Sequence, residues 1–334
     1  MSRVELPDHA DQTYGHDLLP ALLEPGTYAV RPEPSGPPRR PWDEVGAHEA
    51  EARGVYLPVS RLPYGPRGTV AIAPGDVRGT VLIPERCDGC CCGLDERNGP
   101  NLACEQCGLA VATRVDDCGR WQAVWLDPRA VRPAGVEGPA RTPAGWDELR
   151  ETCPDPPPVE QPGWWSPRWE ASVAVALARL LAVSGGRRIV VPDGPVAGAF
   201  RKALDTLLPP GPSARNLVLA GPGLSVTTAD IALVPRHPQT GRSWQCDAGS
   251  VVPLAAGVWV SMAFHDDRRL APAAAGMPDA VRRDDPPPPL PCRPFLPDLD
   301  VFLRTLARLP AAREPWLRAV HDRVRDRRHT LPCF

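Results

Sequence analysis

The chain has 334 residues, 43% of them hydrophobic, and a formal net charge of −2 at pH 7. This length predicts two or three domains of roughly 100–200 residues each, and the small net charge argues against a protein that binds nucleic acid over its whole surface. Its 11 cysteines would suit a secreted disulfide framework, but residues 1–10 lack the apolar segment of a signal peptide. We therefore expect a cytoplasmic protein with reduced cysteines and, because no apolar run approaches ~18 residues, no membrane span.

Residues 1–80 are predicted to form a β-rich N-terminal segment. A short helix is expected over residues 18–23 and a strand over 26–30, followed by an exposed, proline-rich loop at 32–41.

Two runs rich in β-branched residues close this segment. Residues 68–73 and 79–83 lie on either side of the sequence Pro74-Gly75-Asp76, which is typical of a turn. We expect the two runs to be paired strands, the second of which leads directly to the first cysteines.

Residues 81–127 contain two Cys-x-x-Cys pairs, Cys87 with Cys90 and Cys104 with Cys107. Four thiolates with this spacing can surround one Zn²⁺ tetrahedrally, at about 2.3 Å from the metal. The pattern, together with Gly108 and a following hairpin, resembles a zinc ribbon. The resemblance implies a structural zinc ion held by these four cysteines, and it does not indicate a particular function.

The sequence departs from the zinc-ribbon pattern in having additional cysteines. Cys91 and Cys92 make the first ligand pair ambiguous, and Cys118, in a predicted turn between strands at 109–113 and 121–126, could replace a ligand. Acidic residues outnumber basic ones from Cys87 to Cys118, which does not favour direct binding of phosphates here.

Residues 128–163 are predicted to be a proline-rich linker with a short helical turn near residues 146–150. An α/β domain with a mostly parallel sheet is expected over 164–292. Its first helix should begin at Pro167, capped by Ser166, and end at Gly185.

A β–α–β unit follows that first helix. Apolar strands are predicted at 188–191 and 216–220, with a helix between them that begins near Pro195. Further strands are expected at 230–234 and 251–264.

A pocket in this domain is the main alternative to a purely structural protein. Asp193 and Gly221 follow two of the predicted strands, at the edge where open α/β sheets bind ligands. His237 and His265 add titratable side chains that could serve an enzyme. Asp193 and Gly221 also have a simpler interpretation as ordinary turn residues, and His265 as part of an exposed loop.

The order of a ribbon and then a strand ending at Asp193 is also similar to the Toprim domains of primases and recombination proteins. Asp193 stands where those domains have a glutamate, and the second acidic pair that holds Mg²⁺ is missing after Leu219. The resemblance therefore implies a degenerate, non-catalytic relative.

Residues 293–334 are predicted to be a helical tail with two amphipathic helices and several arginines, among them Arg325 and Arg328. We expect a non-catalytic zinc-binding protein that acts through protein contacts. The alternatives are an enzyme that uses the α/β pocket and a nucleic-acid-associated factor that uses the arginine-rich tail.

Overall fold

The computed structural model describes residues 1–89, 91–134, 142–152, 157–160, 163–225, 228–265 and 290–327. The chain forms two compact units that are not contiguous in sequence. Unit 1 comprises Met1–Ala144, His237–Arg242 and Leu303–Asp326, and unit 2 comprises Gly145–Arg236, Ser243–Phe302 and Arg327–Phe334. The main boundary falls inside the proline-rich segment 128–163, whereas the helical tail is divided between the units. Among the described helices, none has the length and apolar character needed to cross a membrane.

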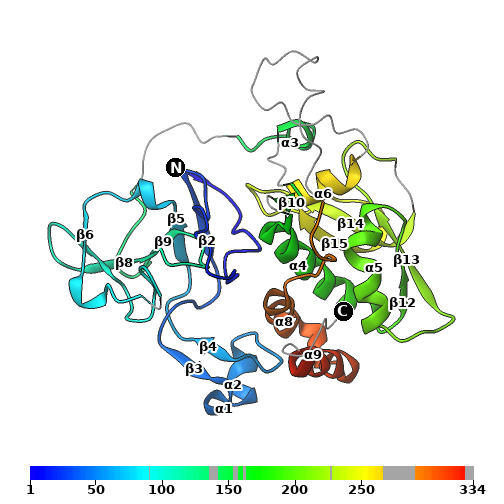
Figure 1. Ribbon diagram of the computed structural model, residues 1–334, viewed down its shortest axis with the longest axis horizontal. Coiled ribbons are helices and arrows are strands. Elements are labelled where there is room, and N and C mark those ends of the chain that lie inside the picture. The colour runs from blue at the N-terminus through cyan, green and yellow to red at the C-terminus, as the bar shows by residue number, and fades with distance from the viewer. Residues whose placement is uncertain are drawn as a thin grey trace. The chain divides into compact units, whose positions relative to one another are not determined.

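Unit 1 is built on a seven-stranded sheet with the strand order β1-β2-β5-β9-β8-β7-β6. All neighbours are antiparallel except β1 and β2, which are parallel. Figure 1 shows this sheet in blue and cyan. Its strands are β1 (Ser2–Arg3), β2 (Thr27–Arg31), β5 (Thr69–Ile72), β6 (Thr80–Leu82), β7 (Leu102–Cys104), β8 (Ala110–Val115) and β9 (Ala123–Leu126).

The expected pairing of residues 68–73 with 79–83 is wrong, although both runs are strands. β5 lies between β2 and β9, whereas β6 is at the edge of the sheet beside β7. The intervening Pro74–Asp76 forms a short 3-10 helix, η1, and not a hairpin turn. Because each strand finds an antiparallel partner elsewhere in the chain, the local turn signal does not decide the pairing.

The two strands predicted after the second cysteine pair are present. β8 and β9 are antiparallel neighbours, with Thr113 opposite Trp125. Trp121 and Ala123 are buried in one core cluster, against which Trp125 packs, as the predicted alternation requires.

The helix expected at residues 18–23 does not form. The segment is irregular, yet Leu19, Leu22 and Leu23 are buried in the same cluster as Trp121. Leu22 donates its backbone N–H to the carbonyl of Gln122 (2.8 Å) and not to a helical partner.

The rest of unit 1 consists of short elements and part of the C-terminal tail. These are β3 (Arg39–Pro41) paired with β4 (Arg61–Pro63), helices α1 (Trp42–Val45) and α2 (Ala47–Ala52), the 3-10 turns η2 (Pro84–Arg86) and η3 (Pro310–Arg313), and α9 (Pro315–Arg327). The backbone N–H of Tyr56 donates to the carbonyl of Ala307 (2.7 Å), and Arg313 forms an ion pair with Glu51. The C-terminal segment is thus bonded to the N-terminal part of the chain within one unit.

Unit 2 contains the predicted parallel sheet, with the order β12-β13-β14-β15 and every pair parallel. This confirms a mixed α/β fold. The strands are β12 (Arg188–Val190), β13 (Ala214–Leu219), β14 (Ala229–Arg236) and β15 (Ala248–Ala255), and a separate small pair is formed by β10 (Val159–Glu160) and β11 (Trp164–Trp165). Helices α3 (Trp146–Thr152), α4 (Pro167–Ser184), α5 (Pro195–Leu207), α6 (Ala256–Ala263) and α8 (Leu299–Arg308) accompany them, the last of which continues into unit 1.

The first long helix of this unit matches the prediction at both ends. α4 begins at Pro167 and stops before Gly185, which adopts the left-handed conformation (φ 61°) that glycine tolerates best. Ser166 occupies the N-cap position, but its side chain makes no capping hydrogen bond. Helix α4 and helix α5, the crossover between β12 and β13, both belong to unit 2 and are labelled in Figure 1.

The strand expected at residues 251–264 is only half correct. β15 ends at Ala255, and the chain continues as helix α6, in which Trp259 is fully buried. An apolar run with no polar face fits a buried helix as well as a buried strand, so the pattern does not distinguish them.

Candidate metal centre

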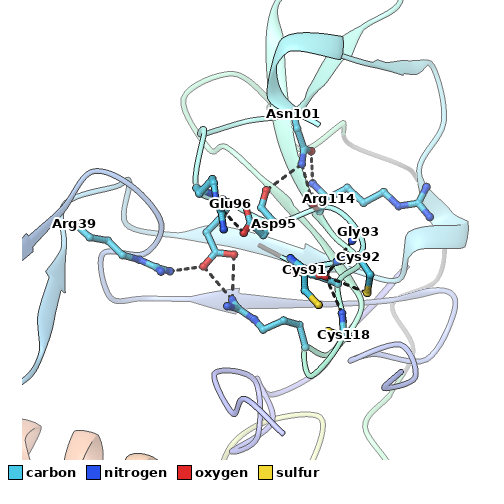
Figure 2. Close-up of polar contacts among 12 residues, drawn as sticks. Arg39, Cys91, Cys92, Gly93, Asp95, Glu96, Asn101, Arg114 and Cys118 are labelled. Atoms are coloured by element: carbon cyan, nitrogen blue, oxygen red, sulfur yellow. Dashed lines mark hydrogen bonds and ion pairs between the residues drawn. The ribbon is translucent and has the colours of Figure 1, made fainter. Parts of the chain in front are cut away.

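Four side chains from two loops of unit 1 come together in a group that could hold a metal ion. The ligand atoms of Cys91, Cys92, Asp117 and Cys118 all lie within 4.8 Å of one another. The first two residues belong to the loop between η2 and β7, and the other two belong to the connection between β8 and β9. Figure 2 shows the three cysteines facing a common point.

The carboxylate of Asp117 holds the two loops together. Its Oδ1 accepts hydrogen bonds from the backbone N–H groups of Cys92 (2.8 Å), Gly93 (3.0 Å) and Cys118 (3.0 Å). Its Oδ2 accepts one from the backbone of Cys91 (3.3 Å). Burial disfavours ionisation of Asp117, but these donors outweigh it and lower the pKa of the carboxyl. The side chain is buried, so a negative charge is held at the centre of the loops.

A close backbone approach accompanies these hydrogen bonds. Leu94 and Asp116 form an isolated antiparallel bridge, and a Cβ placed on Gly93 would lie 1.7 Å from the carbonyl oxygen of Asp116. Only glycine fits at this contact. The positions of Cys91 and Cys92 therefore depend on the absence of a side chain at Gly93, the residue that follows them.

Two buried polar residues fix the remainder of the loop (Figure 2). Asn101, which is fully buried, donates to the carbonyls of Asp95 (3.2 Å) and Arg114 (2.9 Å), and it accepts from the backbone of Arg114 (2.7 Å). Because Asn101 begins the approach to β7 and Arg114 lies in β8, this amide joins the cysteine loop to the sheet.

Glu96 connects the same loop to the β8–β9 connection. Its carboxylate accepts from Arg120 (3.0 Å to each oxygen) and from Arg39 (2.5 Å). Burial raises the pKa of Glu96, but the positive charges of Arg120 and Arg39 have the larger effect, and the pKa is lowered overall. The two cysteine-bearing loops are thus held together by charge at Glu96 as well as at Asp117.

The three thiols influence one another's protonation. Hydrogen bonding with the Cys91 thiol, burial, and hydrogen bonding with the Cys92 thiol raise the pKa of Cys118 to about 12. Closely spaced thiols resist forming adjacent negative charges. A bound cation removes that resistance, because metal binding displaces thiol protons.

The four predicted ribbon ligands are distributed differently. In the antiparallel pair of β6 and β7, Cys104 lies at one end, opposite Thr80. Cys87 follows β6 beyond Leu82 and therefore lies at the other end of this pair. Cys90 lies outside the described residues, so the full predicted set stays a prediction. Among the described residues, Cys87, Cys104 and Cys107 do not form a metal-ligand group.

Cys104 and Cys107 nevertheless form a tight turn suited to a thiolate. The backbone N–H of Gly108 donates to the carbonyl of Cys104 (2.9 Å). The backbone N–H groups of Cys107 and Gln106, followed by the Cys107 thiol, lower the pKa of Cys104. The turn in this half of the predicted motif thus favours a thiolate at Cys104.

The four residues of the predicted α/β pocket do not share one environment. Asp193 is almost fully exposed (94%) and pairs with Arg201 (2.7 Å). Gly221 packs against the indole of Trp259, and His265 is exposed just after α6.

His237 belongs to unit 1, whereas the other three belong to unit 2. Its Nδ1 accepts from the backbone of Gln239 (3.1 Å) and Thr240 (3.2 Å), and its Nε2 is 3.0 Å from the carbonyl of Ala144. The histidine thus organises a turn.

Part of the arginine-rich tail is paired with acids of its own helix. In α9, Arg325 forms ion pairs with Asp322 (3.2 Å) and Asp326 (3.2 Å), while Arg328 lies outside the described residues. The positive charge of this guanidinium is therefore already balanced locally.

Sequence spacing alone does not identify the observed group. Cys91, Cys92 and Cys118 were recognisable as departures from the ribbon pattern, but Asp117 gave no signal beyond its acidity.

In comparisons with protein-family models, curated proteins and solved structures, no match to this chain was found.

Proposed function

We propose that this protein is a non-catalytic, zinc-binding protein that acts through contacts with other proteins. The observation that carries the metal proposal is the convergence of Cys91, Cys92 and Cys118 around the buried, amide-bonded Asp117. Thiolate-rich sites favour Zn²⁺, Cu(I) and iron–sulfur clusters over hard cations such as Mg²⁺. Among these, only Zn²⁺ has no redox chemistry, and its structural sites are usually four-coordinate and rich in thiolates.

The non-catalytic character is supported by the state of Asp117. A catalytic zinc centre commonly needs a carboxylate or histidine to move a proton. The Asp117 carboxylate accepts backbone hydrogen bonds at both oxygens, so it is poorly placed to act as a base. Metal binding to loops without their own hydrogen-bonded secondary structure instead contributes folding free energy.

Elemental analysis of the reduced full chain tests the metal proposal. We expect about one zinc ion per chain, lost in Cys118→Ser because a neutral serine hydroxyl replaces an anionic thiolate ligand. Cys246→Ser, a cysteine of unit 2, is the matched control and should retain the zinc.

The same experiment distinguishes the two possible ligand sets. If Cys107→Ser loses zinc while Cys118→Ser keeps it, the metal belongs to the predicted ribbon set that includes Cys104. A wild-type chain with no bound metal would overturn the proposal.

The proposed protein contact rests on the edge of the unit 1 sheet. β6 is the last strand in the order, and its Val81 and Leu82 are 47% and 48% exposed. Leu109, in the neighbouring cysteine turn, is 54% exposed. An exposed strand edge with large apolar side chains is a site where an extended segment of another protein can add a strand.

A charge placed on this edge should abolish that contact. We expect proteins retained on the immobilised wild-type chain from extracts of its own host to be lost with Leu82→Lys. Leu18→Lys, which alters another exposed leucine of unit 1 (77% exposed), is the matched control and should retain them. Equal retention by both variants, measured by quantitative mass spectrometry, would place the contact elsewhere.

A further inference from the structure

We infer that His16, from the N-terminal loop, is the fourth ligand of the metal centre, and that Asp117 orders the ligands without coordinating the metal. This inference rests on the proposed zinc centre and completes its ligand set as three thiolates and one imidazole. It also makes the N-terminal loop part of that centre.

The first argument is distance. His16 Nδ1 lies 3.7 Å from the Sγ of Cys118, although the two residues are 102 positions apart in sequence. In a tetrahedral site with Zn–S of about 2.3 Å and Zn–N of about 2.0–2.1 Å, the sulfur and nitrogen are separated by roughly 3.6 Å. The observed spacing matches two ligands of one ion. His16 is not among the four residues whose ligand atoms all lie within 4.8 Å of one another, so zinc binding would have to draw its imidazole towards Cys91 and Cys92.

The second argument is that the backbone holds the histidine loop in place. Tyr14 donates its N–H to the carbonyl of Gly119 (2.9 Å), and Gly119 donates its own N–H to the carbonyl of Asp17 (2.7 Å). These bonds flank His16 on both sides and attach its loop to the residue that follows Cys118. The proximity of the two side chains therefore follows from backbone pairing.

Glycine makes this pairing possible. Gly119 has a φ of 69°, and a Cβ at this position would lie 2.4 Å from the carbonyl oxygen of Gly15. An isolated bridge between Thr13 and Arg120 extends the contact. Because Arg120 also pairs with Glu96, the histidine loop is connected to the hydrogen-bonded structure that supports the cysteines.

The third argument concerns Asp117 as the competing ligand. Its Oδ1 accepts three backbone N–H bonds and its Oδ2 a fourth, so coordination would compete with the bonds that position Cys91 and Cys92. A fourth anionic ligand would also leave a net charge of −2 at the centre, whereas neutral imidazole leaves −1. Outer groups that orient the ligands are a normal part of metal sites.

The test uses the full-length chain loaded with zinc and X-ray absorption spectroscopy at the zinc edge. We expect three sulfur neighbours and one nitrogen, with the outer-shell scattering of an imidazole. In His16→Ala the imidazole signal should disappear, and zinc affinity should fall by at least the roughly 10–100-fold typical of losing a supporting group. His48→Ala, which changes an exposed histidine in α2 of the same unit, should alter neither quantity.

A substitution that preserves coordination separates ligation from general disruption. His16→Cys should restore tight binding and give four sulfur neighbours. Hydrogen exchange at residues 13–17 should be slowed by zinc in the wild type and not in His16→Ala.

The outcomes separate the inference from the proposed function. Zinc bound by the wild type without imidazole scattering, and unchanged by His16→Ala, would overturn the assignment of His16 and leave the cysteine centre standing. No zinc in the wild-type chain would overturn both.

Discussion

Replacing Asp117 with alanine should abolish metal binding and release the loop that carries Cys91 and Cys92. The substitution leaves four backbone N–H groups without their common acceptor. Hydrogen bonds to charged groups contribute about 1.5–3 kcal/mol each, although exposure of the two cysteines lets water replace part of this. We expect a loss of roughly 2–5 kcal/mol in the free energy of unfolding of unit 1, measured by denaturant titration of the wild type and the variant, both without metal.

The neighbouring acid provides the matched control. The side chain of Asp116 pairs with Arg114 (2.8 Å), and both are partly exposed, so Asp116→Ala should cost about 0–1 kcal/mol and leave metal binding intact. Asp117→Asn keeps an acceptor oxygen without the charge and should be intermediate. If Asp117→Ala retains zinc at wild-type affinity, the carboxylate does not organise the centre.

The second large effect is expected at Gly221 in unit 2. A Cβ at this position would lie 2.3 Å from the indole of Trp259, which is fully buried and donates its Nε1–H to the carbonyl of Leu233 (3.2 Å). The ring cannot move without losing this bond and disturbing the core. Gly221→Ala should therefore destabilise unit 2 by about 1–3 kcal/mol or more. This loss should be measured as a lower midpoint of denaturant unfolding, followed by tryptophan fluorescence.

Gly198 is a control of opposite sign. It is exposed in α5, and a Cβ there meets no atom within 4 Å. Since alanine is favoured over glycine in a helix interior, Gly198→Ala should stabilise the unit by about 0.5–1 kcal/mol. Wild-type stability in Gly221→Ala would mean that the indole does not fill this position in solution.

Local signals in the sequence predicted elements better than their partners. The proline at the start of α4 and the glycine after it determined the bounds of that helix, because caps act within one turn. The partners of β5 could not be found in this way, since β2 and β9 are distant in sequence and the turn at Pro74–Asp76 carries no information about them. α6 was mistaken for a strand because burial on every side removes the helical period.

The candidate metal-binding group was predictable in kind but not in membership. Cysteine spacing indicated thiolate ligation in residues 81–127, and Cys104 and Cys107 do form a turn that favours a thiolate. The grouping of Cys92 with Cys118 depends on how the loop between η2 and β7 folds back on the β8–β9 connection. No spacing rule relates His16 to Cys118, because backbone hydrogen bonds between the His16 loop and Gly119 bring the two together.

The interleaving of the two units has a consequence for how the chain is made. Synthesis proceeds from the N-terminus, yet unit 1 includes His237–Arg242 and Leu303–Asp326. The backbone N–H of Tyr56 and the carboxylate of Glu51 gain their partners Ala307 and Arg313 only when residues 303–326 have left the ribosome. A nonsense mutation upstream of these residues would therefore damage unit 1, most of which is synthesised much earlier.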